Sequence, residues 1–233
     1  MLHFDDLSFV NIQLETYGGA FVTYKKTLFA LFVVFFVMSS TCSAGTTPKG
    51  GSGLINIPVA YIARDWKGSI GYFNTYDGES TAGNVSLPIG VEFAYSRWRL
   101  DDGDNCSIFS FKVPLMKEKV LKPALAIGVE DITNRFDRHF YLVMSKQGPL
   151  GFRLHLGARN GHKVNGLFYG LEKQIRLKGN LAKQHLFIPV LNFTLEYDGQ
   201  HVNYGMYIRN SKGIRLDFAW HDNSFRTGVQ YEF

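Results

Sequence analysis

Residues Arg226-Thr227-Gly228-Val229-Gln230-Tyr231-Glu232-Phe233 close the chain with a strict two-residue alternation. From Phe225 onward, one parity is mostly apolar and the other is polar or glycine: the first holds Phe225, Thr227, Val229, Tyr231 and Phe233, and the second holds Arg226, Gly228, Gln230 and Glu232. Such a period places the two sets on opposite faces of a β-strand. A soluble protein seldom ends on an apolar strand, because termini fray and exposed strand edges invite aggregation. In an outer-membrane β-barrel the last strand pairs with the first, so no edge remains.

The same stretch resembles the terminal targeting strand of bacterial outer-membrane proteins. A polar residue is followed two positions later by Gly228, and aromatic residues stand third-last and last, at Tyr231 and Phe233. These three residues are therefore the candidate barrel-insertion signal. An ordinary sheet strand at the end of a soluble domain would alternate in the same way, so the rest of the chain has to decide between the two.

A secretory leader occupies the start of the chain, residues 1–44. Tyr24-Lys25-Lys26 precedes an apolar run at 28–38 and the small residues of 39–44, the three parts of a signal peptide. The run is too short to cross a bilayer as a helix, which needs about 20 residues. We interpret 24–44 as a signal peptide cleaved after Ala44, with Ser43 as the alternative, and 1–21 as an over-extended start. The residues before Cys42 do not resemble a lipid-attachment site.

Composition narrows the remaining function classes. The formal net charge of +5 is spread over the 233 residues without a basic run, so nucleic acid is not an expected partner. After cleavage only Cys106 remains, which excludes an internal disulfide and a cysteine metal site. Aromatic residues make up 15% of the chain and there are 24 glycines, as suits a barrel.

Residues 214–221 show the strand pattern that recurs along the chain. Ile214, Leu216, Phe218 and Trp220 share one face, and Arg215, Asp217 and His221 the other. The same alternation appears at 91–96, 109–113, 152–159, 167–172, 191–198 and 201–209, with turn-like junctions at 101–103, 147–149, 160–161, 178–180, 198–199, 211–213 and 221–223. Short junctions indicate an antiparallel meander. At about ten residues a strand, the mature chain holds about 12 strands. About ten is the main alternative, because the phases near Ile70 and Phe140 are ambiguous.

The polar face distinguishes a barrel from a soluble sandwich. It carries many small residues together with single charges of both signs. A narrow lumen needs small residues, and charges of both signs can pair inside it. We therefore predict an all-β, up-and-down transmembrane barrel over 65–233 in the outer membrane of a Gram-negative bacterium. The candidate lumen-lining residues are Glu92, Lys112, Glu130, Arg153, His155, Glu172, Glu196, Arg215, Asp217, Arg226 and Glu232.

Residues 45–64 form an N-terminal segment outside the meander. They are either the first strand or a lumen plug, since Pro58 would interrupt a central strand. Five aromatic residues are interpreted as an interfacial belt: Trp66, Tyr72, Trp98, Tyr207 and Trp220.

The segment Gly53-Leu54-Ile55-Asn56-Ile57-Pro58-Val59-Ala60 resembles the opening motif of the YjbH-like exopolysaccharide biosynthesis proteins. Residues 123–131, 140–146 and 195–199 resemble later segments of that family. The resemblance implies a Gram-negative outer-membrane barrel with an accessory, non-catalytic role in export or surface assembly of exopolysaccharide or capsule. It transfers no catalytic residues and no cofactor. Better-known members resemble two barrels in one polypeptide, whereas this chain has the length of one.

Two other functions remain open: a small selective channel and a lipid-modifying enzyme. An enzyme would need a Ser–His–acid arrangement. His155, His201 and His221 lie on the inward parity near Ser145, Asp198 and Asp217, but no nucleophile elbow or metal spacing accompanies them. The expected partners are outer-membrane lipid and the barrel assembly machinery, with polysaccharide and export proteins added by the resemblance.

Overall fold

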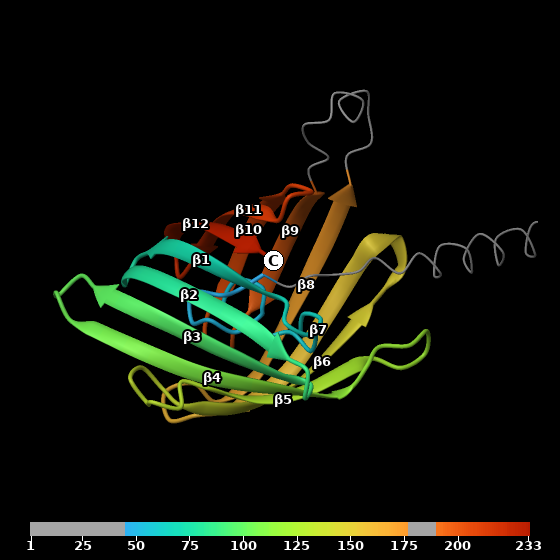
Figure 1. Cartoon of the computed structure of the whole chain (residues 1–233), viewed down its shortest axis with the longest axis horizontal. Coiled ribbons are helices and arrows are strands. Elements are labelled where there is room, and N and C mark those ends of the chain that lie inside the picture. Colours follow the sequence, from blue (N-terminus) through green and yellow to red (C-terminus); the bar gives the residue numbers. More distant parts are fainter. Residues whose placement is uncertain (1–44, 177–189) are drawn as a thin grey trace, which may run out of the picture. The chain divides into compact units, whose positions relative to one another are not determined.

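The computed structural model describes residues 45–176 and 190–233, and the strands from Gly68 onward form one closed antiparallel barrel (Figure 1). The predicted leader lies outside these residues, as does the predicted turn at 178–180. Each strand pairs with its neighbours in sequence, so the larger of the two predicted strand numbers is confirmed. The 12 strands are β1 Gly68–Thr75, β2 Gly78–Leu87, β3 Val91–Leu100, β4 Asn105–Met116, β5 Ala124–Glu130, β6 His139–Gln147, β7 Phe152–Asn160, β8 Gly166–Arg176, β9 Val190–Tyr197, β10 Val202–Arg209, β11 Ile214–His221 and β12 Ser224–Glu232.

The pairing of β1 with β12 closes the barrel. The register runs from Ser69 opposite Glu232 to Asn74 opposite Thr227. Beyond it, the N–H of Phe233 donates to the carbonyl of Gly68 at 3.0 Å, and the N–H of Gly68 donates back at 3.3 Å. The last residue of the chain therefore continues the ladder instead of fraying, and the apolar terminal strand has no free edge.

Tight turns keep consecutive strands adjacent. Asp222 and Asn223, the two residues between β11 and β12, both have a left-handed backbone, with φ of 48° and 60°. A two-residue turn of this handedness matches the twist of the flanking strands, and Asp and Asn tolerate it better than most residues. The one helical element described is η1, a single 3₁₀ turn at Pro149–Gly151.

The two faces of each strand differ as the alternation predicts. On β7, Arg153, His155 and Arg159 are buried, while Leu154 is 57% exposed and Leu156 46% exposed. An outer surface of exposed Leu, Ile, Phe and Tyr side chains is suited to lipid and not to water.

Two of the five predicted belt residues are placed wrongly by the sequence interpretation. Trp66, Tyr72 and Trp220 are exposed, but Trp98 and Tyr207 are 5% exposed and lie on the inward parity. Each has an interior hydrogen bond: the indole Nε1–H of Trp98 donates to Ser96, and the Tyr207 hydroxyl accepts from Asn192. A buried aromatic residue with a satisfied polar atom is stable in the lumen, so residue type alone misassigned these two.

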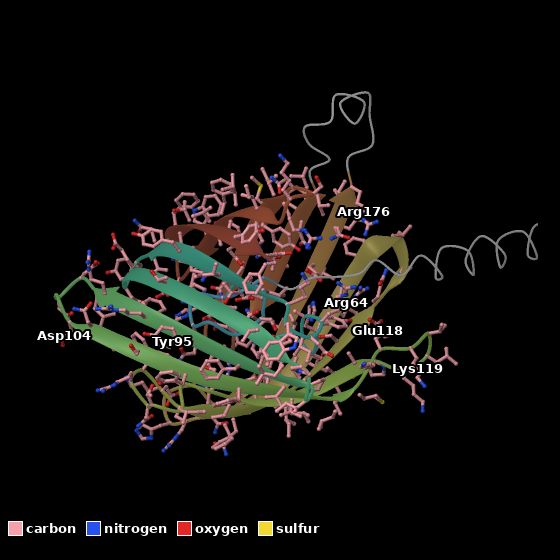
Figure 2. The ribbon with its side chains drawn as sticks, viewed as in Figure 1. Arg64, Tyr95, Asp104, Glu118, Lys119 and Arg176 are labelled. Carbon is pink, nitrogen blue, oxygen red and sulfur yellow. The ribbon has the colours of Figure 1, made fainter. Side chains whose placement is uncertain are left out.

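The barrel has two ends, which are named here by the chain termini. At the terminal end, β1 begins, β12 ends, and the 117–123 loop carries Glu118 and Lys119. The far end carries the β1–β2, β3–β4, β5–β6, β7–β8, β9–β10 and β11–β12 connections. Figure 2 shows Asp104 of the β3–β4 loop and Glu118 on opposite sides of the molecule. In the described part of the chain, no helix is both long and apolar enough to span a membrane, a finding that concerns helices alone.

Candidate functional site: a plugged lumen

Residues 45–61, called the plug below, do not form a strand of the barrel wall. The plug folds on itself through two isolated bridges, Thr46 with Ser52 and Gly53 with Pro58. Its polar groups then bond to side chains on the inward faces of six strands: β2, β3, β4, β6, β9 and β12. Of the two sequence interpretations of this segment, the structure therefore contains the lumen segment and not a first strand.

The plug begins and ends at the terminal end and reaches the far end between. At its start, the N–H of Thr46 donates to Gln230 near the end of β12, at 2.9 Å. In the middle, the side-chain amide of Asn56 donates to Asp198 of the far-end β9–β10 turn, at 3.0 Å. At its end, the hydroxyl of Tyr61 donates to Glu118 of the terminal-end loop, at 2.7 Å. The plug thus extends toward the far end twice, at Pro48 and Lys49 and again at Asn56, and returns toward the terminal end between them at Ser52.

One wall contact is a buried ion pair on β3 and β4. The ammonium of Lys112 lies 3.1 Å from a carboxylate oxygen of Glu92, and both side chains are at most 2% exposed. Glu92 accepts from the N–H of Ser52 at 2.9 Å and from its hydroxyl at 2.6 Å, and Lys112 donates to the carbonyl of Ser52 at 2.8 Å. The plug therefore supplies hydrogen bonds that this buried pair needs to offset its desolvation.

A second wall contact is Glu196 on β9. Its carboxylate accepts from the backbone N–H groups of Ile55 at 3.0 Å and Asn56 at 2.8 Å. From β12, Arg226 donates to the carbonyl of Ile55 at 2.5 Å. Backbone groups that a loop cannot pair internally are thus satisfied by charged wall residues.

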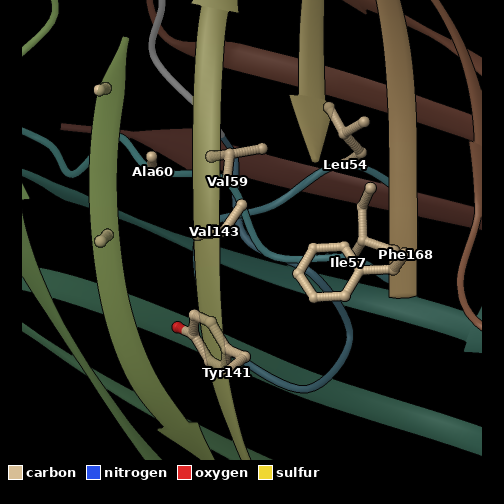
Figure 3. Close-up of a cluster of buried hydrophobic side chains, with 9 residues drawn as sticks. Leu54, Ile57, Val59, Ala60, Tyr141, Val143 and Phe168 are labelled. Atoms are coloured by element: carbon tan, nitrogen blue, oxygen red, sulfur yellow. The ribbon is translucent and has the colours of Figure 1, made fainter. Parts of the chain in front are cut away.

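An apolar cluster holds one side of the plug against β5, β6 and β8 (Figure 3). Its plug members are Leu54, Ile57, Val59 and Ala60, and its wall members are Ala124, Ala126, Tyr141, Val143 and Phe168. Small wall residues make the space: a Cβ at Gly170 would lie 2.7 Å from the terminal methyl groups of both Ile57 and Leu54. Gly170 therefore leaves room for the plug, whereas Gly128 and Gly157 leave room for the wall side chains of Tyr141 and Phe168.

The Ser–His arrangement considered from the sequence is also bound to the plug. The Oγ of Ser145 lies 2.7 Å from Nδ1 of His155, and Nε2 of His155 lies 3.6 Å from Glu172. Ser145 is fully buried, and its Oγ accepts the N–H of Ala60 at 2.9 Å. The hydroxyl is therefore buried and engaged as an anchor for the plug.

The remaining histidines and acids of that interpretation lie elsewhere. His221 lies 2.9 Å from the side-chain oxygen of Asn203, and His201 lies 3.4 Å from Asp222. Asp217 pairs with Arg215 at 2.5 Å near the terminal end. His201 and His221 therefore lie together at the far end, where His221 is also 3.6 Å from Asp198, and Asp217 lies apart from them. None of the contacts described for these side chains involves Ser145.

The candidate lumen-lining residues all lie on inward parities. Glu92, Lys112, Glu130, Arg153, His155, Glu172, Glu196 and Arg215 are buried, and Asp217, Arg226 and Glu232 are partly buried. Several contact other wall residues: Glu130 lies 2.7 Å from His139, Arg153 lies 3.1 Å from Glu172, and Arg209 lies 2.8 Å from Glu232. Glu130 and Arg153 also contact the plug, through Lys49 and the ring of Tyr61.

Sequence reasoning missed the uncharged anchors on β2. The hydroxyl of Ser80 donates to the carbonyl of Pro48 at 2.5 Å, and the amide of Asn84 donates to that of Gly50 at 3.1 Å. A prediction of lumen contacts from charged residues does not include Ser80 or Asn84. The signal that could have found them is the run of Ser80, Ala82, Asn84 and Ser86 on one parity, all small or polar and all buried.

Of the insertion-signal residues, Tyr231 and Phe233 face outward and are 50% and 45% exposed. Gly228 faces inward, where a Cβ would lie 2.5 Å from the ring of Phe73. Gly228 therefore also has a packing role, and the insertion signal stays a prediction.

The far-end turns are held by carboxylates. Burial alone would raise the pKa of Asp198, but hydrogen bonds from the His201 N–H, the side-chain amides of Asn56 and Asn203, and the Gln200 N–H outweigh it and lower the pKa to about 2. Asp198 is therefore ionised at neutral pH and links the plug to the β9–β10 turn.

Across the described ranges, no group of three or more His, Cys, Asp or Glu side chains is placed to hold a metal ion.

No protein-family model matches this chain, and no curated protein matches it either. Among solved structures it is similar to a KdgM porin, at 13% identity and a TM-score of 0.49, over 71% of this chain and 99% of the other. A structure described as KdgM porin in complex with disordered oligogalacturonate matches with the same values. At this level of likeness, the fold assignment rests on the strand pairing described above.

Proposed function

We propose that this chain is an outer-membrane barrel that forms a narrow channel, held closed by residues 45–61. The observation that carries the proposal is a plug inserted from one end into a polar interior. The exposed apolar band of the strands supports a place in a lipid bilayer, and closed antiparallel barrels of this type belong to the outer membrane of Gram-negative bacteria.

The chemistry of the contacts supports a displaceable plug. Most of its anchors are single hydrogen bonds to wall side chains, and each contributes a net of about 0.5–1.5 kcal/mol, or more where a charged group takes part. The apolar contacts are concentrated on β5, β6 and β8. The wall residues left behind, among them Glu92, Lys112, Glu196 and Arg226, are charges that water can solvate. A lumen vacated by the plug would therefore be wetted.

Substitution at Gly170 tests the channel without removing any polar anchor. Gly170→Leu places a bulky side chain where Ile57 and Leu54 now pack, so we expect the plug to be expelled and small sugars to enter proteoliposomes about tenfold or more faster than with the wild type. Gly170→Ala should raise sugar entry less, because the terminal methyl groups of Ile57 and Leu54 can shift away from one added methyl group. Ala158→Leu adds similar bulk on the outer face and should change nothing. If the Gly170→Leu barrel assembles and admits no more solute than the Ala158→Leu control, the channel proposal fails.

The accessory role in polysaccharide export is the second proposal. It rests on the resemblance at 53–60, and those residues are the part of the plug that contacts Glu196 and the apolar cluster. Deleting the gene and measuring surface polysaccharide tests it, since unchanged polysaccharide would remove this role. A catalytic role is disfavoured, because Ser145 is covered by the plug.

A further inference from the structure

A cavity of about 430 Å³ opens at the far end of the barrel, and its floor is the plug. We call it the vestibule. The plug contributes Pro48, Lys49 and Asn56, and the far-end hairpins contribute the walls. This volume lies within the range of pockets that hold small molecules, about 300–1,000 Å³.

The vestibule contains two arginines that donate hydrogen bonds to neutral backbone carbonyls. Arg159, which is 4% exposed, donates to the backbone carbonyl of Asp198. Arg226 donates to the backbone carbonyl of Ile55. The guanidinium group is a planar fork that suits carboxylate and phosphate, and a carbonyl uses only part of that capacity. Lys49 adds a third cation, 3.7 Å from Glu130.

The carboxylates that face the same cavity are engaged with other donors. Asp137 accepts from the N–H groups of His162, Lys163 and Val164. Asp198 accepts from Gln200 and His201 and from the amides of Asn56 and Asn203. Asp77 and Asp222 lie in the exposed rim turns, where Asp222 faces His201 and Lys163 is also exposed. These donors occupy the carboxylate oxygens of Asp137 and Asp198 without removing their charges, so the guanidinium groups of Arg159 and Arg226 are the groups through which the vestibule can hold an anion.

The same cations hold the plug. Arg226 donates to the carbonyl of the plug residue Ile55. Arg159 donates to the backbone carbonyl of Asp198, and the carboxylate of Asp198 accepts from the plug residue Asn56. Lys49 is itself part of the plug. An anion that recruits these groups competes with the contacts that keep the lumen closed. We propose that the vestibule binds a metabolite-sized anion, bearing a carboxylate or a phosphate, and that its binding loosens the plug. The loosening rests on the channel function proposed above, whereas the binding does not.

The test uses the full chain in lipid nanodiscs with three probes of similar ring size: glucuronate, glucose 6-phosphate and glucose. Binding is measured by calorimetry. Plug exposure is measured as the thiol-labelling rate of Gly51→Cys, with Cys42 and Cys106 replaced by Ser, since a Cβ at Gly51 meets no atom within 4 Å. We expect at least one anionic sugar to bind and to speed labelling several-fold, and glucose to do neither. Which anion acts distinguishes carboxylate from phosphate recognition.

Arg226→Gln should weaken anion binding about tenfold and raise labelling without ligand, because Ile55 loses its partner. Arg226→Lys should keep part of the response, and Arg97→Gln on the exposed face of β3 should keep all of it. Lys49 lies in the plug and not in the barrel wall, so Lys49→Gln provides a second test of anion binding and labelling if the Arg226 variants do not assemble. Equal responses to glucose and to both anions would overturn the site, and anion binding with unchanged labelling would overturn the coupling. A Gly170→Leu barrel that admits no solute would contradict the channel proposal. The calorimetric result alone would then decide whether the vestibule binds an anion.

Discussion

Removal of residues 45–61 is expected to raise the single-channel conductance of the barrel by about tenfold or more, because the lumen then loses its main obstruction. The wall strands pair only with one another, from β1 to β12 and back to β1, so none of their ladder hydrogen bonds depends on the plug. The exposed interior would carry charges of both signs. The resulting pore should therefore pass both cations and anions in planar bilayers.

Two further variants make this deletion interpretable. A chain whose residues 54–60 are replaced by an equally long Gly/Ser sequence retains the covalent length but loses the apolar cluster, and it should conduct intermittently. Ile57→Asp places a charge in the cluster and gives the same information with one substitution. If all three barrels assemble and remain as closed as the wild type, something other than the plug obstructs the lumen.

Replacement of Glu92 by Ala is expected to destabilise the assembled barrel by about 3–5 kcal/mol, because it leaves the ammonium of Lys112 buried without its carboxylate. Both side chains are at most 2% exposed and lie 3.1 Å apart. The change also removes the acceptor for the N–H and hydroxyl of Ser52, so the plug should become easier to displace. The free energy is measured by reversible unfolding in urea with lipid vesicles.

The matched controls separate burial from charge. The double variant Glu92→Met with Lys112→Met removes both charges at similar volume, so it should be much less destabilising than Glu92→Ala alone. On the surface, Glu79 and Arg99 lie 3.6 Å apart and are exposed, so Glu79→Ala should cost about 0–1 kcal/mol. A Glu92→Ala barrel as stable as the Glu79→Ala barrel would mean that the buried pair does not form.

The strands were predictable because alternation is a local property. Each stretch such as 214–221 carries its own two faces, and the terminal stretch carries the pairing that closes the sheet. Lumen candidates followed from the same parity. The alternation does not show which residue each lumen side chain contacts. From the sequence, Glu92 and Glu196 are predicted to line a lumen. In the structure, their carboxylates accept hydrogen bonds from the backbone N–H groups of Ser52, Ile55 and Asn56.

The plug itself could not be decided from local pattern. Leu54, Ile57 and Val59 suit a strand as well as a packed loop, and Pro58 is tolerated at a strand edge. Its placement depends on long-range contacts to β3, β9 and β12 that no short stretch encodes. Trp98 and Tyr207 were misassigned for a related reason, since aromatic residues serve both in interfacial belts and in filled interiors, and only their parity distinguished the two.

The central claim is that residues 45–61 occupy the lumen of a membrane-embedded barrel. Backbone hydrogen exchange of the full chain in nanodiscs tests it most directly, because the N–H groups of Ile55 and Asn56 bond to Glu196 and that of Ala60 bonds to Ser145. These amides are expected to exchange far more slowly than those of an unstructured peptide of the same sequence. Exchange of the whole segment at the unstructured rate, beside protected barrel strands, would contradict the claim.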